Sequence, residues 1–321
     1  MVDVLLIPDG ASQPVRAGRP TALQLARTPV LDQLAAAGAV RRVATTPAGL
    51  EPGSEVGIPT LLGFPPAAQV GRGRVEAAAH GVDVPAGLVP WRADVTHADG
   101  RRASMRQALD VAARLGSTAR CLGGHRLLLL SASRPADRQV LGLRLRVWDD
   151  GPPPAGRLPE GTTLICALGA AAGCGRLLGA QIVCPPGATG DTDTDLGAKA
   201  RAAAAAIESG EQRVIVHVGA PDEAAHRRHP GGVAQALERL DLELLVELRE
   251  VVKLARGRLI VCPDHGTDPD TGLHITEPVP AVVWGEGIEP SGPRRLTEHL
   301  ARDTDLVDPG WLLASLPMAC V

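Results

Sequence analysis

The chain has 321 residues, of which 45% are hydrophobic and 21% are charged, so it is long enough for a full hydrophobic core in one or two domains. Its formal net charge is -3, and it has no long basic or acidic run, which argues against nucleic-acid binding and against a polybasic membrane patch. With one Phe, four Trp and no Tyr, it also lacks the aromatic platforms on which bases stack.

The N-terminal segment MVDVLLIPDG has no basic region and only a short apolar run, so we expect no signal peptide. No stretch approaches the ~20 apolar residues that a membrane span needs. The six cysteines show no Cys-x-x-Cys spacing, which is typical of free thiols in a reducing compartment. We therefore expect a cytoplasmic protein without a membrane or nucleic-acid partner. The sequence gives no indication of its oligomeric state.

Short apolar runs alternate with amphipathic helical stretches, which is typical of an α/β fold with a mostly parallel sheet. We expect a first strand at 2–7, a helix at 29–37 with Thr28 as its N-cap, and a short helix at 55–63 preceded by Ser54. Further strands are expected at 163–167, 180–184, 213–218, 258–262 and 279–284, and further helices at 169–178, 195–208 and 233–254.

The middle of the chain differs in character and ends near a proline-rich break, Gly151-Pro152-Pro153-Pro154. It contains one expected helix and two apolar runs, at 103–115, 126–131 and 140–147. We therefore predict a discontinuous core domain formed by residues 1–64 and 156–321, with residues 65–155 inserted as a second domain.

Polar side chains follow the predicted strands at their carboxyl ends, which is where ligands bind in open α/β sheets. These residues are Asp9, His217, Asp222, His226, Asp264 and His265. Carboxylates and imidazoles together suit Zn²⁺, Mn²⁺ or a similar divalent ion. The sequence therefore predicts a metal site at one edge of the sheet.

The spacing of these residues favours two ions. Asp222 and His226 lie four residues apart, so one helical turn can direct both at one ion. Asp264 and His265 are adjacent, so on an extended chain they point apart and can serve two ions. His274 follows in a loop and can complete a shell. Two ions ~4 Å apart stabilise the attacking and leaving oxygens in phosphoryl transfer.

Ser54, in the segment Pro52-Gly53-Ser54-Glu55, is the candidate nucleophile. A serine at a helix N-terminus feels positive partial charge, and coordination to a metal lowers the pKa of its hydroxyl. Each motif alone has an ordinary structural explanation, such as a strand-end turn or an N-cap. Their joint occurrence in this order favours a metal-dependent active site.

The ordered set resembles the cofactor-independent (2,3-bisphosphoglycerate-independent) phosphoglycerate mutases of the archaeal type, a branch of the alkaline-phosphatase superfamily. The resemblance runs over most of the chain and includes PGSEVGIPTLLGF (52–64), VHVGAPDEAAH (216–226) and IVCPDHGT (260–267). The segments APDEAAH (220–226) and PDHGT (263–267) are quite specific. It implies an alkaline-phosphatase-like α/β core, with a mostly parallel sheet flanked by helices, and an inserted α+β cap domain that closes over the substrate.

The resemblance also implies two divalent metal ions, Mn²⁺ or Zn²⁺ in the first place, with Co²⁺ or Mg²⁺ as alternatives. One ion would be bound by Asp9, Ser54, Asp264 and His265, with Ser54 transiently phosphorylated. The other ion would be bound by Asp222, His226 and His274.

The implied substrate is a small phosphorylated carboxylic acid, 2- or 3-phosphoglycerate or a close analogue. Its phosphate and carboxylate would be bound by Arg72, Arg92, Arg101, Arg102, His125 and Arg126. Asp149 and Asp150 match an acidic pair near the substrate hydroxyls, where one can act as general acid or base. Lys199 matches a lysine near the phosphate.

Two departures bear on the substrate. The family's Gly-Ser-Asp is here Gly53-Ser54-Glu55, and the short interval between Asp150 and the strand at 163–167 lacks the family's arginine-glycine motif. Arg157 is the arginine of this interval that can replace it. The alternatives are therefore a transferase acting on a phosphonate- or phosphinate-pathway intermediate, a phosphomonoesterase and, least favoured, a non-catalytic metal-binding protein.

Overall fold

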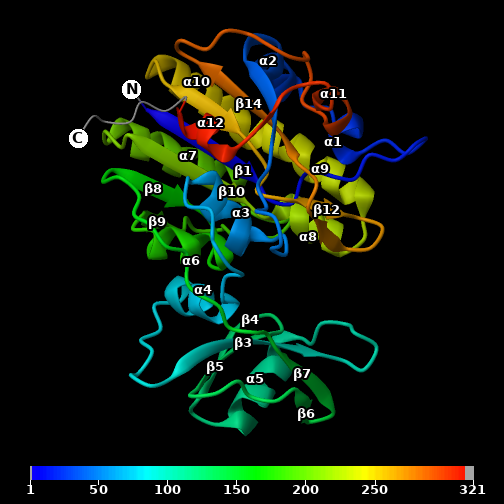
Figure 1. Cartoon of the computed structure of the whole chain (residues 1–321), viewed down its shortest axis with the longest axis vertical. Helices are drawn as coiled ribbons and strands as arrows, with labels where there is room; N and C mark the ends of the chain where they lie inside the picture. Colours follow the sequence, from blue (N-terminus) through cyan, green and yellow to red (C-terminus); the bar gives the residue numbers. More distant parts are fainter. Residues whose placement is uncertain (1, 315–321) are drawn as a thin grey trace.

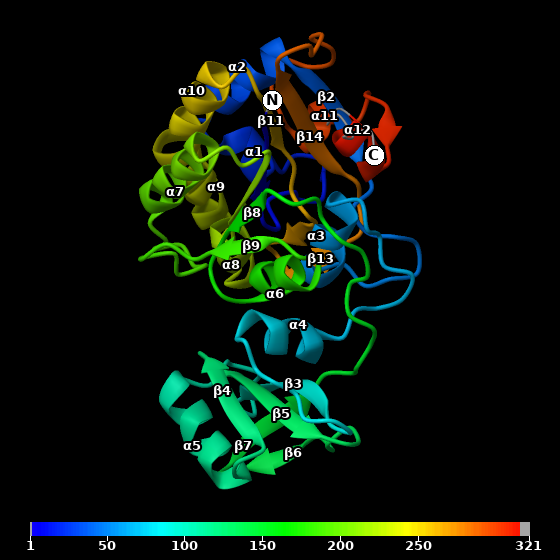
Figure 2. The same cartoon turned by 90° about the vertical axis from the view of Figure 1, so that its left-hand side faces the viewer.

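A computed structural model describes residues 2–314, and its centre is an eight-stranded sheet with helices on both faces (Figures 1 and 2). The strands are β1 (Asp3–Pro8), β2 (Ala39–Val43), β8 (Thr162–Ile165), β9 (Gln181–Val183), β10 (Arg213–Val218), β11 (Arg258–Val261), β14 (Val279–Gly285) and β15 (Leu306–Val307). Their order is β15-β2-β14-β11-β1-β10-β8-β9. The five strands from β11 to β9 are parallel and β14 is antiparallel to β11, which confirms the predicted, mostly parallel sheet.

Two layers of helices cover this sheet, because both faces of its central strands are apolar. In β1, Val4 and Leu6 face one layer, whereas Leu5 and Ile7 face the other. The first layer contains α1 (Ala22–Leu25), α2 (Pro29–Ala37), α7 (Leu196–Glu208), α8 (Ala220–His226), α9 (Pro230–Leu240), the π-helix η1 (Asp241–Leu245), α10 (Val246–Leu254) and α11 (Glu298–Ala301). The second contains α3 (Ser54–Leu61), α6 (Ala170–Leu177) and α12 (Pro309–Ala314). No helix within residues 2–314 has both the length and the apolar character that crossing a bilayer requires.

A second, five-stranded antiparallel sheet lies at the other end of the molecule (Figure 2). Its strands are β3 (Val89–Thr96), β4 (Ala119–Gly123), β5 (Arg126–Ser131), β6 (Arg138–Val140) and β7 (Leu143–Val147), in the order β4-β5-β3-β7-β6. Helix α5 (Met105–Leu115) packs its apolar side chains against one face of this sheet.

Helix α4 (Arg72–Ala79) lies between the two sheets (Figure 2). Its Val75 joins the core of the larger sheet, while Ala77 packs against Leu128 of β5. At Gly73, a Cβ atom would lie 1.9 Å from a backbone carbonyl oxygen of β3. Glycine therefore allows α4 to contact the small sheet directly.

The ends of the helices agree with the sequence in some places and not in others. Helix α2 begins at Pro29 as predicted, but the Thr28 side chain makes no capping bond. Instead, the Asp241 carboxylate accepts hydrogen bonds from the amides of Val30 (3.1 Å) and Leu31 (2.8 Å). The single helix predicted at 233–254 is three segments, α9, η1 and α10, and the π-helical turn η1 carries Asp241.

A buried carboxyl group links the start of the chain to α11. Glu298 is 7% exposed. Its Oε2 accepts a hydrogen bond from the Thr21 hydroxyl (2.6 Å), and its Oε1 accepts one from the Gln13 amide (2.8 Å). Burial raises the pKa of Glu298 to about 7, although these bonds oppose the shift.

Replacement of Glu298 tests this burial. Since its pKa is above the usual 4.5, the stability that protonated Glu298 contributes is complete below that pH and is lost as the pH rises through about 7. We expect the resulting loss to be on the order of 3 kcal/mol. Urea unfolding at about pH 5 and about pH 8 should show a smaller pH-dependent decline in Glu298→Gln than in the natural protein. The exposed Glu289→Gln is the control, and an equal decline in all three proteins would contradict the assignment.

Candidate metal centre and active site

The first group of ligand-type side chains lies at the carboxyl edge of the neighbouring strands β1 and β11. Asp9 follows β1, and Asp264 and His265 follow β11; one ligand atom of each lies within 4.8 Å of the others. The Nε2 atom of His265 is 3.2 Å from Asp9 Oδ1. The extended chain assumed for Asp264 and His265 is not found: both residues form a bend, and this bend brings both side chains into one group.

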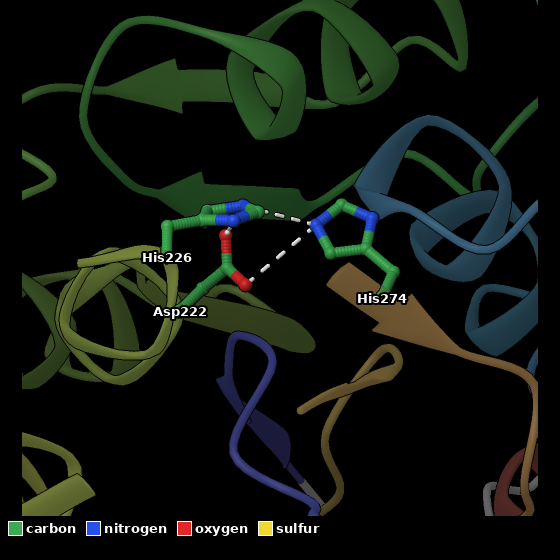
Figure 3. Close-up of side chains that lie close together, drawn as sticks. All are labelled: Asp222, His226 and His274. Carbon is green, nitrogen blue, oxygen red and sulfur yellow. Dashed lines mark hydrogen bonds and ion pairs between the residues drawn. The ribbon is translucent and has the colours of Figure 1, made fainter. Parts of the chain in front are cut away.

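The second group consists of Asp222, His226 and His274 (Figure 3). One turn of α8 brings His226 Nε2 to 3.0 Å from Asp222 Oδ2. His274 comes from β13 (Leu273–Ile275), which pairs with β12 (Gly266–Asp268), and its Nε2 is 3.1 Å from that of His226. The Nδ1 atoms of His226 and His274 lie 2.8 and 3.0 Å from the carbonyl oxygens of Gly272 and Pro52. These carbonyls favour the tautomer with the proton on Nδ1, which leaves Nε2 free to bind a metal.

These residues fit divalent cations. Asp264 Oδ2 and His265 Nε2 are buried atoms without a hydrogen-bond partner within residues 2–314, and such atoms are costly unless something binds them. Burial and the neighbouring Asp9 raise the pKa of Asp264 to about 6. Burial and the neighbouring His265 lower the pKa of His274 to about 4. Strongly shifted pKa values in a cleft are typical of functional sites.

Ser54 is the first residue of α3 and lies beside the first group. Its hydroxyl donates a hydrogen bond to Asp9 Oδ1 at 3.2 Å. Gly53 precedes it with φ 157°, a conformation that is essentially restricted to glycine. At Gly57, a Cβ atom would lie 2.1 Å from the carbonyl oxygen of Asp264. Gly53 and Gly57 thus bring α3 against the bend that contains Asp264 and direct Ser54 toward Asp9.

His217, at the end of β10, supports Asp9 from the other side. Its Nε2 lies 3.4 Å from Asp9 Oδ2. Although burial opposes the shift, His217 and His265 lower the pKa of Asp9 well below its usual value. The ammonium group of Lys199 donates a hydrogen bond to the His217 carbonyl at 2.7 Å. Lys199 is fully buried and does not line the cavity described next.

A cavity of about 970 Å³ opens beside both groups and extends to the small sheet. The positive charges on its walls are Arg72, Arg92, Arg102, Arg126, Arg146 and Arg227. Four of the six predicted substrate-binding residues are therefore cavity arginines, and the fifth, His125, also lines it. The sixth, Arg101, does not, because it is exposed and pairs with Asp99 at 2.7 Å.

The cavity arginines of α4 and β3 are held by acidic side chains. Arg72 pairs with Glu55 at 2.6 Å. Arg92 pairs with Glu76 at 2.5 Å and with Asp94 at 2.6 Å. These ion pairs fix the guanidinium groups of Arg72 and Arg92. The carboxylates also compensate part of the positive charge of the two arginines.

Three other predicted residues lie outside the cavity. Asp149 pairs with Arg134 at 2.9 Å, and Asp150 pairs with Arg74 at 2.7 Å. Arg157 is exposed and does not line the cavity. The general acid–base role of the aspartates and the phosphate contact of Arg157 stay predictions.

The sequence analysis did not single out Arg146, Trp148 and Arg227. Trp148 donates a hydrogen bond from its indole nitrogen to Asp94 at 2.7 Å, and Arg72 and Arg146 lie over its ring at 4.1 and 4.3 Å. Within residues 2–314, Arg146 has no acidic partner. The alternation of apolar and basic residues in Leu143–Val147 was the sequence signal that could have placed Arg146 on the polar face of a strand.

Comparison with known proteins agrees with this geometry. A model of the metalloenzyme superfamily matches residues 162–308, and one of 2,3-bisphosphoglycerate-independent phosphoglycerate mutase matches residues 35–116. The chain is similar to the 2,3-bisphosphoglycerate-independent phosphoglycerate mutases and to the metalloenzyme superfamily. This confirms the predicted class, a metal-dependent phosphomutase.

The similarity to individual relatives covers nearly the whole chain. The 2,3-bisphosphoglycerate-independent phosphoglycerate mutase 2 of Methanothermobacter thermautotrophicus is 28% identical, over 95% of this chain and 94% of its own. The Methanoculleus marisnigri mutase is also 28% identical, over 89% and 90%. Among solved structures, the PH0037 protein from Pyrococcus horikoshii has a TM-score of 0.83 at 20% identity, covering 98% of this chain and 96% of its own. The cofactor-independent phosphoglycerate mutase from Thermoplasma acidophilum has a TM-score of 0.59 at 18% identity, covering 96% of both chains.

Removal of one ligand tests the second group. We expect His274→Ala to lower the Mn²⁺ content, after loading and desalting, from about two to about one ion per chain, because the remaining pair is too weak a site. Inductively coupled plasma mass spectrometry measures this content. The exposed His299→Ala is the matched control and should keep both ions. Retention of both ions by His274→Ala would show that the group does not bind metal.

Proposed function

We propose that this protein interconverts 2- and 3-phosphoglycerate, or a close analogue, through transient phosphorylation of Ser54. The observation that carries the proposal is the position of the Ser54 hydroxyl. This hydroxyl donates a hydrogen bond to Asp9 in the first group of ligand-type side chains. Ser54 also lines the cavity that has guanidinium groups on its walls. A nucleophile, cation ligands and anion-binding groups in one cavity are the components that phosphoryl transfer requires.

The metal ligands are proposed as two sets, Asp9, Ser54, Asp264 and His265 for one ion and Asp222, His226 and His274 for the other. Bound divalent ions would neutralise charge on the transferred phosphoryl group and lower the pKa of the Ser54 hydroxyl. We propose Mn²⁺ or Zn²⁺, with Co²⁺ or Mg²⁺ as alternatives, since oxygen and imidazole donors accept all four.

In the proposed reaction, the Ser54 oxygen attacks the phosphorus in line and the substrate oxygen leaves, which gives a phosphoserine and a free hydroxy acid. The acid then turns within the cavity, and its other hydroxyl takes the phosphoryl group back. The cavity arginines bind the carboxylate and phosphate while this happens. Arg126 and Arg146 are the best placed for this, because acidic side chains compensate their charge least. Arg146 has no acidic partner within residues 2–314, and the contact of Arg126 with Glu76 is long, at 3.7 Å.

We propose that residues 1–64 and 156–321 form the catalytic domain and that residues 65–155 form a domain that closes over the substrate. Arg102 supports this division, because it reaches from the small-sheet side to Glu223, next to Asp222, at 3.2 Å. The exclusion of bulk water by such closure keeps the phosphoserine from hydrolysis. Free thiols at the described cysteines fit the cytoplasm as the compartment.

A second candidate is the same chemistry on a different phosphorus-containing acid, such as a phosphonate- or phosphinate-pathway intermediate. The position of Arg157 outside the cavity favours this candidate. The interval between Asp150 and β8, which lacks the arginine-glycine motif, supplies no residue to the cavity wall. A phosphomonoesterase is the third possibility, in which water takes the phosphoryl group.

The activity is tested by incubating Mn²⁺-loaded protein with 3-phosphoglycerate and following the phosphorus NMR signals. We expect 2-phosphoglycerate to form, and Ser54→Ala to lower the rate by at least about 10³-fold while still binding metal. Release of inorganic phosphate alone would favour the phosphomonoesterase. Ser54-dependent cleavage of a generic phosphate ester without isomerisation would favour another acid substrate. Full activity in Ser54→Ala would exclude the phosphoserine.

Arg146 offers a second test with a matched control on the same strand. We expect Arg146→Met to raise KM for the acid by about 10-fold to 100-fold, because an unpaired guanidinium supplies a charge-assisted bond to an anion. Arg144→Met removes the same charge two residues earlier, on the same exposed face of β7 but outside the cavity, and should leave KM within about two-fold. Steady-state kinetics decide this, and equal effects of the two variants would remove Arg146 from the binding site.

A further inference from the structure

Two cysteines lie side by side where β8 and β9 end. These strands are parallel neighbours in which Ile165 pairs with Val183. The next residue on each strand is a cysteine, and the Cys166 amide donates a hydrogen bond to the Val183 carbonyl at 3.1 Å. Residues that pair across neighbouring strands lie about 5 Å apart at their Cα atoms and point to the same face, which is within the range of a disulfide.

The two thiols differ in accessibility, and they interact with each other. Cys166 is fully buried and Cys184 is exposed. A hydrogen bond between their side chains lowers the pKa of Cys184 to about 6, assisted by the positive charges of Arg176 and Lys199. The same bond, together with burial, raises the pKa of Cys166. The exposed thiol is therefore the more acidic of the two.

Neither cysteine belongs to the metal site, but both adjoin the cavity through the chain that follows them. Residues 167–171 follow Cys166 and residues 189–191 lie just after Cys184, and both segments line the cavity. Lys199, which is near both thiols, donates its hydrogen bond to the carbonyl of the cavity residue His217. A covalent bond between the two cysteines would join these two cavity segments.

We propose that Cys184 and Cys166 are a redox-active pair, in which exposed Cys184 reacts with a peroxide and buried Cys166 completes a disulfide. In the first step, the Cys184 thiolate attacks a peroxide oxygen; the O–O bond breaks, and a sulfenic acid and hydroxide form. In the second step, the Cys166 sulfur attacks the Cys184 sulfur, the S–O bond breaks and water leaves with the Cys166 proton. The two thiols lose two electrons in total, and one peroxide is reduced.

The pair is tested by peptide mapping. The full-length protein is reduced, desalted, treated with one equivalent of hydrogen peroxide at neutral pH, alkylated and digested with trypsin. We expect a disulfide between the peptides 158–176 and 177–199, which carry Cys166 and Cys184, and its loss on treatment with dithiothreitol. Because Cys174 shares the first peptide, Cys174→Ser should keep the link and Cys166→Ser should lose it.

The Cys166→Ser variant distinguishes the two steps. Without the second thiol, the Cys184 sulfenic acid should persist and be trapped by dimedone, whereas the natural protein should give little adduct. Cys121→Ser changes a half-buried cysteine on the small sheet and should behave like the natural protein. A Cys184 that is oxidised in the natural protein without forming the link, or a link that survives in Cys166→Ser, would overturn the proposal.

The pH dependence of Cys184 alkylation tests the hydrogen bond between the two thiols. The rate of Cys184 alkylation by iodoacetamide should reach half its maximum near pH 6 in the natural protein. In Cys166→Ala, the pH at which the alkylation rate is half-maximal should move up by at least about one unit, toward the usual thiol pKa of ~8.5. An unchanged profile in a variant with normal circular dichroism would show that the thiols do not interact and would also overturn the proposal.

Discussion

The crowding of carboxylates and imidazoles at the carboxyl edge of the large sheet is the constraint on which the rest of the structure depends. Asp9, Asp222 and Asp264 are all buried there, where unpaired negative charge is costly. Neighbouring histidines compensate part of this charge, yet Asp264 keeps a raised pKa and an unpartnered oxygen. Bound cations would compensate this charge. In the proposed function, metal binding and catalysis therefore depend on the same residues.

The small sheet supplies the opposite charge. Arg92 of β3 lines the cavity and is held by Glu76 and Asp94, and Arg72 of the adjoining helix α4 is held by Glu55. Glu55 is notable because it belongs to α3, directly after Ser54, while its partner Arg72 belongs to α4. This ion pair connects the helix of Ser54, the proposed nucleophile, with the helix that lies between the two sheets. The arginines are thus oriented before any anion binds, which lowers the entropic cost of binding one.

Much of the fold was predictable, because buried parallel strands read as short apolar runs and amphipathic helices carry their own period. The strands of the parallel core are examples. The expected helix at 233–254 could not be resolved into its segments, since the π-helical turn arises where Asp241 turns inward to cap another helix. Among the arginines, residue type alone did not separate Arg101, which is exposed, from Arg146, which lines the cavity.

The sequence by itself determined the ligand types, the nucleophile candidate and the side of the sheet on which they meet, because strand ends in a parallel sheet share one edge. Only the tertiary structure decided which ligands group together: a bend rather than extended chain brings Asp264 and His265 to the same group. Tertiary structure also decided that Lys199 is buried beneath His217 rather than in the cavity, and that two cysteines 18 residues apart in sequence, Cys166 and Cys184, are neighbours. Strand pairing and burial are long-range properties of the packed chain, and local sequence patterns do not encode them.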